Sequence, residues 1–196
     1  MVLPYGTVRK VARERLDRDV WTRAALDVMG ERGVAGLAIE PLARSLGTTK
    51  GSFYWHFRDR EDLIQAALER WENSETDAVI AMLGPLADGR SRLRELLTAI
   101  FLTHADGPDR SVGLAADIGS PAVQEALARV TRRRIDYVAE QLMAAGIDAA
   151  ESRHRAVLAY TSYLGWSTMM RSTPGVLPQR EQAAAFVDSM MRLLVH

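Results

Sequence analysis

Apolar residues recur at intervals of three and four along most of this 196-residue chain, and this spacing restricts the possible folds more than any other feature. An α-helix places residues three and four apart on one face, whereas a β-strand needs apolar and polar residues to alternate. We find no run of alternating β-branched residues bounded by turns. The pattern therefore predicts an all-α fold of about nine helices, and the 47% hydrophobic content is ample for a packed core.

Two absences limit the class of protein. The chain has no cysteine, which excludes disulfides, thiolate catalysis and cysteine-ligated zinc. The first ten residues, MVLPYGTVRK, contain no apolar stretch typical of a signal peptide, and no later stretch approaches the ~20 apolar residues of a bilayer span. We therefore expect a soluble, cytoplasmic protein with no contact to a membrane.

The segment from Ala38 to Arg60 has the size and pattern of a helix-turn-helix. It predicts a short helix around Pro41–Leu46, a turn at Gly47, and a second helix over about Thr49–Phe57 with Thr48 or Thr49 as its cap. Phe53 and Phe57 are four apart and form the inward stripe of the second helix.

The remaining positions of this second helix carry chemically diverse side chains. Hydroxyl, amine, phenol, indole and imidazole groups can contact phosphates and base edges, and they belong to Thr49, Lys50, Ser52, Tyr54, Trp55 and His56. Residues 1–60 also hold 11 Lys and Arg against 7 Asp and Glu, in a chain of zero net charge. The pattern favours binding to DNA, although aromatic residues at helical spacing are also common where two domains pack together.

The rest of the chain predicts further helices and a basic arm. Residues 1–16 carry Arg9, Lys10, Arg13 and Arg15, which suit either a DNA-contacting arm or a solvated terminus. Helices are predicted to begin at Asp17 or Asp19 and end at Gly33, to run from Asp59 to Leu83, and to cover about 91–105, 121–145, 149–172 and 179–195. The runs GPLADGR and GPDRSVG are predicted loops.

The last of these helices has apolar residues over most of its circumference, so it must bury two sides. Two-fold pairing with a second copy of the chain is the commonest solution, and the sequence favours a homodimer. The expected interface residues are Phe186, Val187, Met190 and Leu194.

The spacing Glu151-x-x-His154 occurs in di-iron helical bundles, but such sites need a second copy of the motif and two further glutamates. No second copy exists in the sequence, so we expect no metal ion and no cofactor.

The run LARSLGTTKGSFYWHFRDREDLI closely resembles the signature of the tetracycline-repressor (TetR) family of transcription regulators. The resemblance is specific over the first 70 or so residues and extends to the rest only through helix number and order. It implies a DNA-binding domain at 1–60 with a basic arm, a ligand-binding and dimerisation domain at 61–196, and a dimer interface on the last two long helices. It also implies that Arg60 contacts a phosphate, and the full set of candidate DNA-binding residues is Arg44, Thr48, Thr49, Lys50, Ser52, Tyr54, Trp55, His56 and Arg60.

The first helix of the motif departs from the family pattern. The family often has Ser or Thr at its start, where the hydroxyl donates to a phosphate, but here the start reads Ala38, Ile39, Glu40, Pro41. Either this helix contributes less to DNA affinity, or Arg44 takes over the contact.

The resemblance implies a ligand-responsive regulator, which we expect to be a repressor that binds near-palindromic operator DNA and is released by a small-molecule effector. Candidate ligand-binding residues on the middle helices are polar-tipped or adaptable apolar groups, although each is also an ordinary core residue: Phe101, His104, Tyr137, Tyr163, Trp166 and Met170.

An alternative is a helical-bundle enzyme or small-molecule carrier without a DNA-binding role, but we find no nucleophile and base at fixed spacing and no phosphate loop. A helical interaction module with an incidental basic N-terminus is a third possibility.

Overall fold

The computed structural model describes residues 17–103, 110–115, 117 and 119–196, and in these residues the fold is all-α with no strand. Because α4 and α5 belong to one continuous helix, the described residues contain the predicted nine helices. Their bounds are α1 Arg18–Arg32, α2 Ile39–Ser45, α3 Lys50–Phe53, α4 Arg60–Glu72, α5 Ala78–Leu83, α6 Gly89–Thr103, α7 Arg110–Ala115, α8 Pro121–Ala144, α9 Ala149–Ser172 and α10 Ala183–Val195. No helix in the described ranges combines the length and the hydropathy needed to cross a bilayer.

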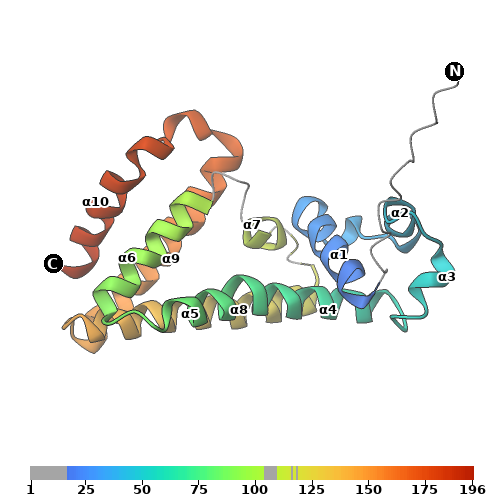
Figure 1. The fold of residues 1–196 in the computed structure, drawn as a ribbon, viewed down its shortest axis with the longest axis horizontal. Coiled ribbons are helices and arrows are strands. Elements are labelled where there is room, and N and C mark those ends of the chain that lie inside the picture. Colours follow the sequence, from blue (N-terminus) through green and yellow to red (C-terminus); the bar gives the residue numbers. More distant parts are fainter. Residues whose placement is uncertain (1–16, 104–109, 116, 118) are drawn as a thin grey trace, which may run out of the picture.

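Helices α1 to α3 form one end of the elongated molecule (Figure 1). Helix α1 begins where Asp17 accepts a hydrogen bond from the Val20 amide at 3.0 Å, as the sequence predicts for a capping aspartate. Gly47 joins α2 to α3 with φ +66°, a conformation that glycine adopts without steric strain. The three helices pack around Trp21 and Phe53, both fully buried, with ring centroids 5.6 Å apart.

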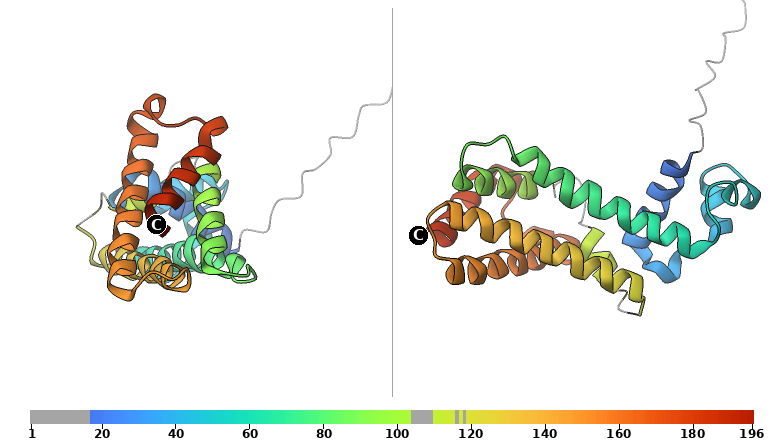
Figure 2. Two further views of the ribbon diagram at one scale, coloured as in Figure 1. Left: turned by 90° about the vertical axis from the view of Figure 1, so that its left-hand side faces the viewer. Right: turned by 90° about the horizontal axis from the view of Figure 1, so that it is seen from below.

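A continuous helix connects the two ends of the molecule. Helices α4 and α5 are joined by one π-helical segment, Asn73–Asp77, and together they cover most of the predicted helix. Figure 2 shows α8 running beside this connecting helix, and ion pairs of Arg129 with Glu72 and of Arg133 with Asp77 link the two. The far end therefore sits at a fixed distance from α1 to α3.

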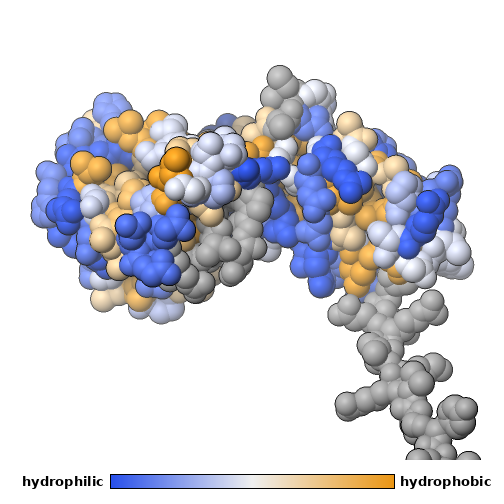
Figure 3. All heavy atoms as spheres, turned by 90° about the horizontal axis from the view of Figure 1, so that it is seen from above, coloured by the Kyte–Doolittle hydropathy of each residue, from blue (hydrophilic) through white to orange (hydrophobic). Residues whose placement is uncertain are grey.

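Two hydrophobic cores occupy the two ends. The first core contains Trp21 and Phe53 but continues past residue 60 through Trp71 on α4, Leu114 on α7 and Val123 on α8. The second core lies between α6, α8, α9 and α10 and includes Leu142 and Met191. The first core thus has members on both sides of position 60, and Figure 3 shows two lobes.

Three element boundaries differ from prediction. Helix α3 ends at Phe53, because the amides of Trp55 and His56 bond three residues back and tighten the chain into a turn. The predicted loop GPDRSVG, residues 107–113, overlaps the first four residues of α7, which forms where it packs on α1. Helix α10 begins at Ala183, after a short 3-10 turn.

Candidate nucleic-acid interface and interior cavities

The structure brings the predicted recognition residues together on one surface. Phe53 and Phe57 are buried as predicted, 0% and 2% exposed, and stack with ring centroids 5.4 Å apart. Their burial turns Tyr54 and Trp55 outward, at 54% and 87% exposure. Lys50 and Thr49 are also exposed, while Thr48, Ser52 and His56 are half-buried at the edge of this surface. The exposed phenol and indole therefore lie beside the exposed Lys50 amine and are accessible to a partner.

Helix α2 contributes both a cation and an anion to this surface. Arg44 is exposed, as a phosphate contact requires. Lys50 Nζ lies 3.2 Å from Glu40 Oε1, and both side chains are more than half exposed. The N-terminus of α2 has Ala38 at its cap position and no side-chain cap, and Thr49 likewise makes no capping bond to α3. The amides at both helix starts therefore lack side-chain caps, and amides of this kind are donors suited to phosphate.

Arg60 has a different position from the other candidates. Its Nε donates to the Leu37 backbone oxygen at 2.8 Å and its Nη2 to the Val34 oxygen at 2.5 Å, while Nη1 pairs with Glu61. These bonds tie the start of α4 to the segment before α2. The structure thus gives Arg60 an internal role, because its donors are directed to backbone carbonyls.

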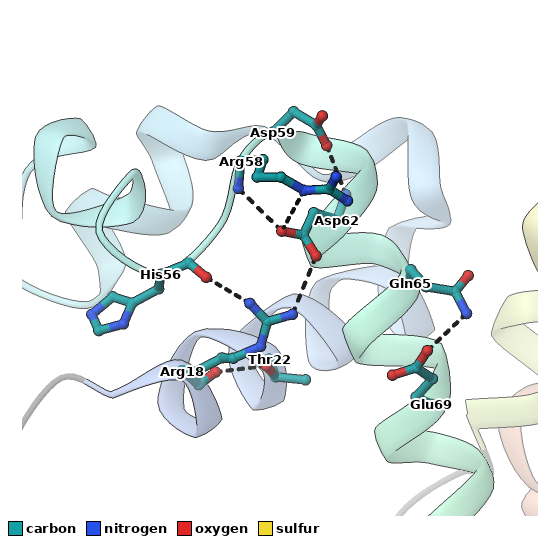
Figure 4. Close-up of polar contacts among 8 residues, drawn as sticks. All are labelled: Arg18, Thr22, His56, Arg58, Asp59, Asp62, Gln65 and Glu69. Atoms are coloured by element: carbon teal, nitrogen blue, oxygen red, sulfur yellow. Dashed lines mark hydrogen bonds and ion pairs between the residues drawn. The ribbon is translucent and has the colours of Figure 1, made fainter.

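Sequence reasoning missed the residue that holds the recognition segment in place. Arg18 Nη1 donates to the His56 backbone oxygen at 2.6 Å, and Nη2 donates to Asp62 Oδ1 at 3.2 Å (Figure 4). The guanidinium also lies 4.2 Å from the centre of the Phe57 ring. Arg18 thereby fixes the turn after α3 to the first turn of α1.

Asp62 completes this contact. Its Oδ2 accepts the Arg58 amide at 3.1 Å, and this bond, with the Arg18 guanidinium, holds the pKa of the carboxyl below its ordinary value. Asp59 caps α4 by accepting the Asp62 amide at 2.8 Å. The turn between α3 and α4 is thus fixed on both sides.

The predicted ligand-binding residues line two neighbouring cavities at the other end of the molecule. We name the first, of about 110 Å³, the central cavity; it lies between α5, α6, α8, α9 and α10 and is lined by Phe101, Tyr137 and Tyr163. The second, of about 240 Å³, is lined by Trp166, Met170 and the other side of Phe101. His104 lies outside the described residues.

Phe101 lines both cavities. Its ring meets Trp166 and Phe186 edge-on, with centroid distances of 4.7 and 4.8 Å.

Of the four residues expected at a dimer interface, Val187 and Leu194 are buried within the protomer, whereas Phe186 and Met190 are half-buried. Val187 and Leu194 are 3% and 5% exposed in the second core, Met190 and Leu194 line the central cavity, and Phe186 packs on Phe101. The sequence showed that α10 has apolar groups on two sides but did not show which side faces α6. An interface on α9 and α10 must use their outward faces, where Leu158 and Leu193 are 64% and 74% exposed.

The two residues of the Glu151-x-x-His154 spacing have different surroundings. Glu151 pairs with Arg155 at 2.6 Å and His154 is exposed. Over the described residues, no three His, Asp or Glu side chains are grouped closely enough to hold a metal ion.

Residues 22–67 match the family model described as bacterial regulatory proteins, tetR family. The regulator AcrR of Shigella flexneri is 38% identical over 53 residues, 27% of this chain and 23% of that protein. The class A tetracycline repressor of Escherichia coli is 42% identical over 55 residues, 28% and 26% of the two chains. The match thus spans about a quarter of the length of these relatives.

A solved structure extends the similarity to the whole fold. AibR in complex with isovaleryl coenzyme A and operator DNA superposes with a TM-score of 0.67, covering 91% of this chain and 97% of that chain at 18% identity. An identity this low shows a shared fold alone. Over residues 22–67 the chain is thus similar to the helix-turn-helix segment of bacterial regulatory proteins of the tetR family, and it carries this segment on a fold that it shares with AibR.

Proposed function

We propose that the chain is a cytoplasmic, homodimeric transcriptional regulator, a repressor that binds operator DNA and is released by a small-molecule effector. The observation that carries this proposal is the exposed surface of Lys50, Tyr54 and Trp55, held outward by the buried Phe53 and Phe57. Because Phe53 and Phe57 are buried, the Tyr54 phenol and the Trp55 indole are exposed and available to contact DNA. Amine, hydroxyl and imidazole groups around them suit phosphates and bases.

A dimer would present two copies of this surface to one face of DNA. Recognition segments that enter successive major grooves lie about 34 Å apart, one helical turn of DNA. Exposed apolar side chains on the outward faces of α9 and α10 support pairing through these helices. The operator would then be a near-palindrome whose half-sites repeat the two-fold symmetry.

The effector would occupy the cavities beside Phe101. AibR, which shares the fold, was solved with both a small molecule and operator DNA, and this supports two sites on one chain. Ligand binding at α6 would change the spacing of the recognition segments through the α4–α5 helix. Coupling between two sites is reciprocal, so operator DNA must weaken effector binding by the same factor.

Selection of bound sequences from random duplex DNA by the purified protein tests the proposal. We expect a two-fold motif with half-sites about one helical turn apart. Affinity for the selected sequence should fall steeply between about 50 and 200 mM salt, because binding releases counterions from phosphates. Failure to enrich any sequence, together with salt-independent retention, would contradict DNA binding and favour a helical-bundle enzyme, a carrier or an interaction module.

A further inference from the structure

The central cavity has an apolar lining with few polar groups. Leucine, isoleucine, valine and methionine side chains of α5, α6, α8 and α10 form most of its wall. The lining residues that carry polar groups are Arg134, Tyr137, Tyr160 and Tyr163. A ligand in this space would meet apolar surface on most sides, and its orientation would depend on these few groups.

Two of these polar groups already have partners in the protein. Arg134 Nε donates to Thr76 Oγ1 at 3.0 Å, and its Nη2 donates to the Glu75 backbone oxygen at 3.1 Å. The Tyr160 hydroxyl lies 3.4 Å from Thr131 Oγ1. These contacts hold the Arg134 guanidinium against the π-helical segment and the Tyr160 hydroxyl against α8.

The Tyr137 hydroxyl has no such partner. Tyr137 is 8% exposed, and its hydroxyl is buried with no hydrogen-bond partner among the described residues. A buried hydroxyl without a partner is unfavourable, because it has given up its hydrogen bonds to water. Phenylalanine would fill the same space without this penalty, so a hydroxyl here suggests an acceptor that arrives with a ligand.

The Tyr137 hydroxyl is suited to donate a hydrogen bond. Burial raises the pKa of this phenol above its ordinary value, so it stays protonated at neutral pH. A carboxylate, by contrast, would lose its hydration in a mostly apolar cavity, and two donors of Arg134 are already committed. A neutral oxygen can accept a hydrogen bond from the Tyr137 phenol without losing the hydration of a charge.

Cavity size limits the molecule further. An apolar cavity of about 150 Å³ in another protein binds benzene. The central cavity, at about 110 Å³, is of this order, and Phe101 lines both it and the second cavity. The space therefore suits a ligand that consists of one ring or a short chain. A longer ligand that extends past Phe101 would require the Phe101 side chain to rotate.

We propose that the central cavity binds a neutral, mainly apolar molecule of single-ring or short-chain size, whose carbonyl-type oxygen accepts a hydrogen bond from the Tyr137 hydroxyl. The inference rests on the proposed function, in which this molecule is the effector. It adds the chemical class of the ligand and the residue that selects it.

Three probes of similar size test the inference by calorimetric titration of the full chain without DNA. Acetophenone carries a neutral carbonyl, ethylbenzene carries no acceptor, and benzoate carries a charge. We expect acetophenone to bind about tenfold more tightly than ethylbenzene, as one hydrogen bond to a buried donor implies, and benzoate to bind more weakly than both. Tyr137→Phe should reduce acetophenone affinity about tenfold and leave ethylbenzene within about twofold.

Tyr160→Phe is the matched control, because the Tyr160 hydroxyl already lies beside Thr131. It should leave the preference for acetophenone over ethylbenzene unchanged. Thermal unfolding gives a second measurement: Tyr137→Phe should unfold at the same or a higher temperature, since it removes an unpaired hydroxyl.

Several outcomes would overturn the inference. These are equal binding of acetophenone and ethylbenzene, tighter binding of benzoate, no effect of Tyr137→Phe on acetophenone, or no binding of either neutral probe at millimolar concentration. Each can occur while DNA selection still yields a two-fold motif, so failure here is distinguishable from failure of the proposed regulator function.

Discussion

At the scale of single residues, Glu40 and Lys50 place opposite charges on the surface proposed to face DNA. The pair is exposed, with 3.2 Å between Nζ and Oε1, so it contributes at most about 1 kcal/mol to folding. The positive charge of Lys50 attracts DNA phosphates, whereas the negative charge of Glu40 repels them. We expect Lys50→Ala to weaken operator binding by about 1–3 kcal/mol, and Glu40→Gln to strengthen it by removing repulsion and freeing the lysine.

The affinity of each variant for operator DNA, measured over a range of salt concentrations, checks both predictions. Lys50→Ala should also reduce the magnitude of the salt slope by about one if Lys50 contacts a phosphate, whereas a base contact should relax sequence preference at one position. Glu140→Gln on α8 makes the same charge change at the other lobe and should leave DNA binding unchanged. An unchanged affinity in Lys50→Ala would remove this residue from the interface.

Asp62 gives a prediction with a defined pH dependence. Its carboxyl has a lowered pKa, so its contribution to stability is complete above the unfolded-state value of about 3.9 and is lost as pH falls through the lower folded value. Asp62→Asn should therefore lower the unfolding temperature at pH 7 by about 2–4 °C. The difference from the unmodified chain should shrink below about pH 4. A difference that stays constant between pH 7 and pH 3 would show that the carboxylate charge is not responsible.

The recognition segment illustrates what sequence can and cannot predict at this scale. The spacing of Phe53 and Phe57 predicts their burial, because helical geometry alone puts them on one face. The contact from Arg18 to the His56 carbonyl joins residues 38 apart in sequence. No local pattern encodes it, since it arises only when α1 packs beside the turn after α3.

At the scale of elements, α7 connects the cavity-bearing lobe to α1. Arg110 pairs with Asp27 of α1 at 2.7 Å and with Glu75 of the π-helical segment at 2.5 Å. Asp117, just beyond α7, accepts the Val34 amide at 2.5 Å. Sequence favoured a loop here because glycine, proline and aspartate are common in turns, and tertiary packing overrides that preference.

The contact between α7 and α1 depends on two glycines. A Cβ at Gly113 would lie 1.8 Å from the Gly30 backbone oxygen, far inside van der Waals contact. Gly113→Ala should therefore push α7 away from α1 and destabilise the fold by about 1–3 kcal/mol in denaturant unfolding. If α7 also transmits the effector signal, this variant should bind acetophenone with weaker coupling to DNA.

Gly175 provides the matched control for this substitution. No atom of the described structure lies within 4 Å of a Cβ at that position, and its φ is not positive. Gly175→Ala should leave stability unchanged or slightly raised. Equal effects of the two substitutions would mean that the contact between Gly30 and Gly113 is not tight.

At the scale of the whole molecule, the outward faces of α9 and α10 are the surface most in need of a partner. Leu158 and Val157 on α9 and Leu193 on α10 are 64%, 39% and 74% exposed. The sequence predicts such a surface, because apolar residues surround most of α10. It cannot assign the two sides of the helix, since periodicity gives the angle between residues but not the direction of the core.

Leu193→Glu tests the proposed dimer. A glutamate in the middle of an apolar interface would lose its hydration without gaining a partner, so the variant should be monomeric in light scattering while keeping its helical content. Operator affinity should fall with it, because one recognition segment contacts only one half-site. Met82→Glu, at a 59% exposed methionine on α5, is the matched control and should leave both properties unchanged. A Leu193→Glu protein that remains dimeric and binds its operator normally would place the dimer interface on another surface.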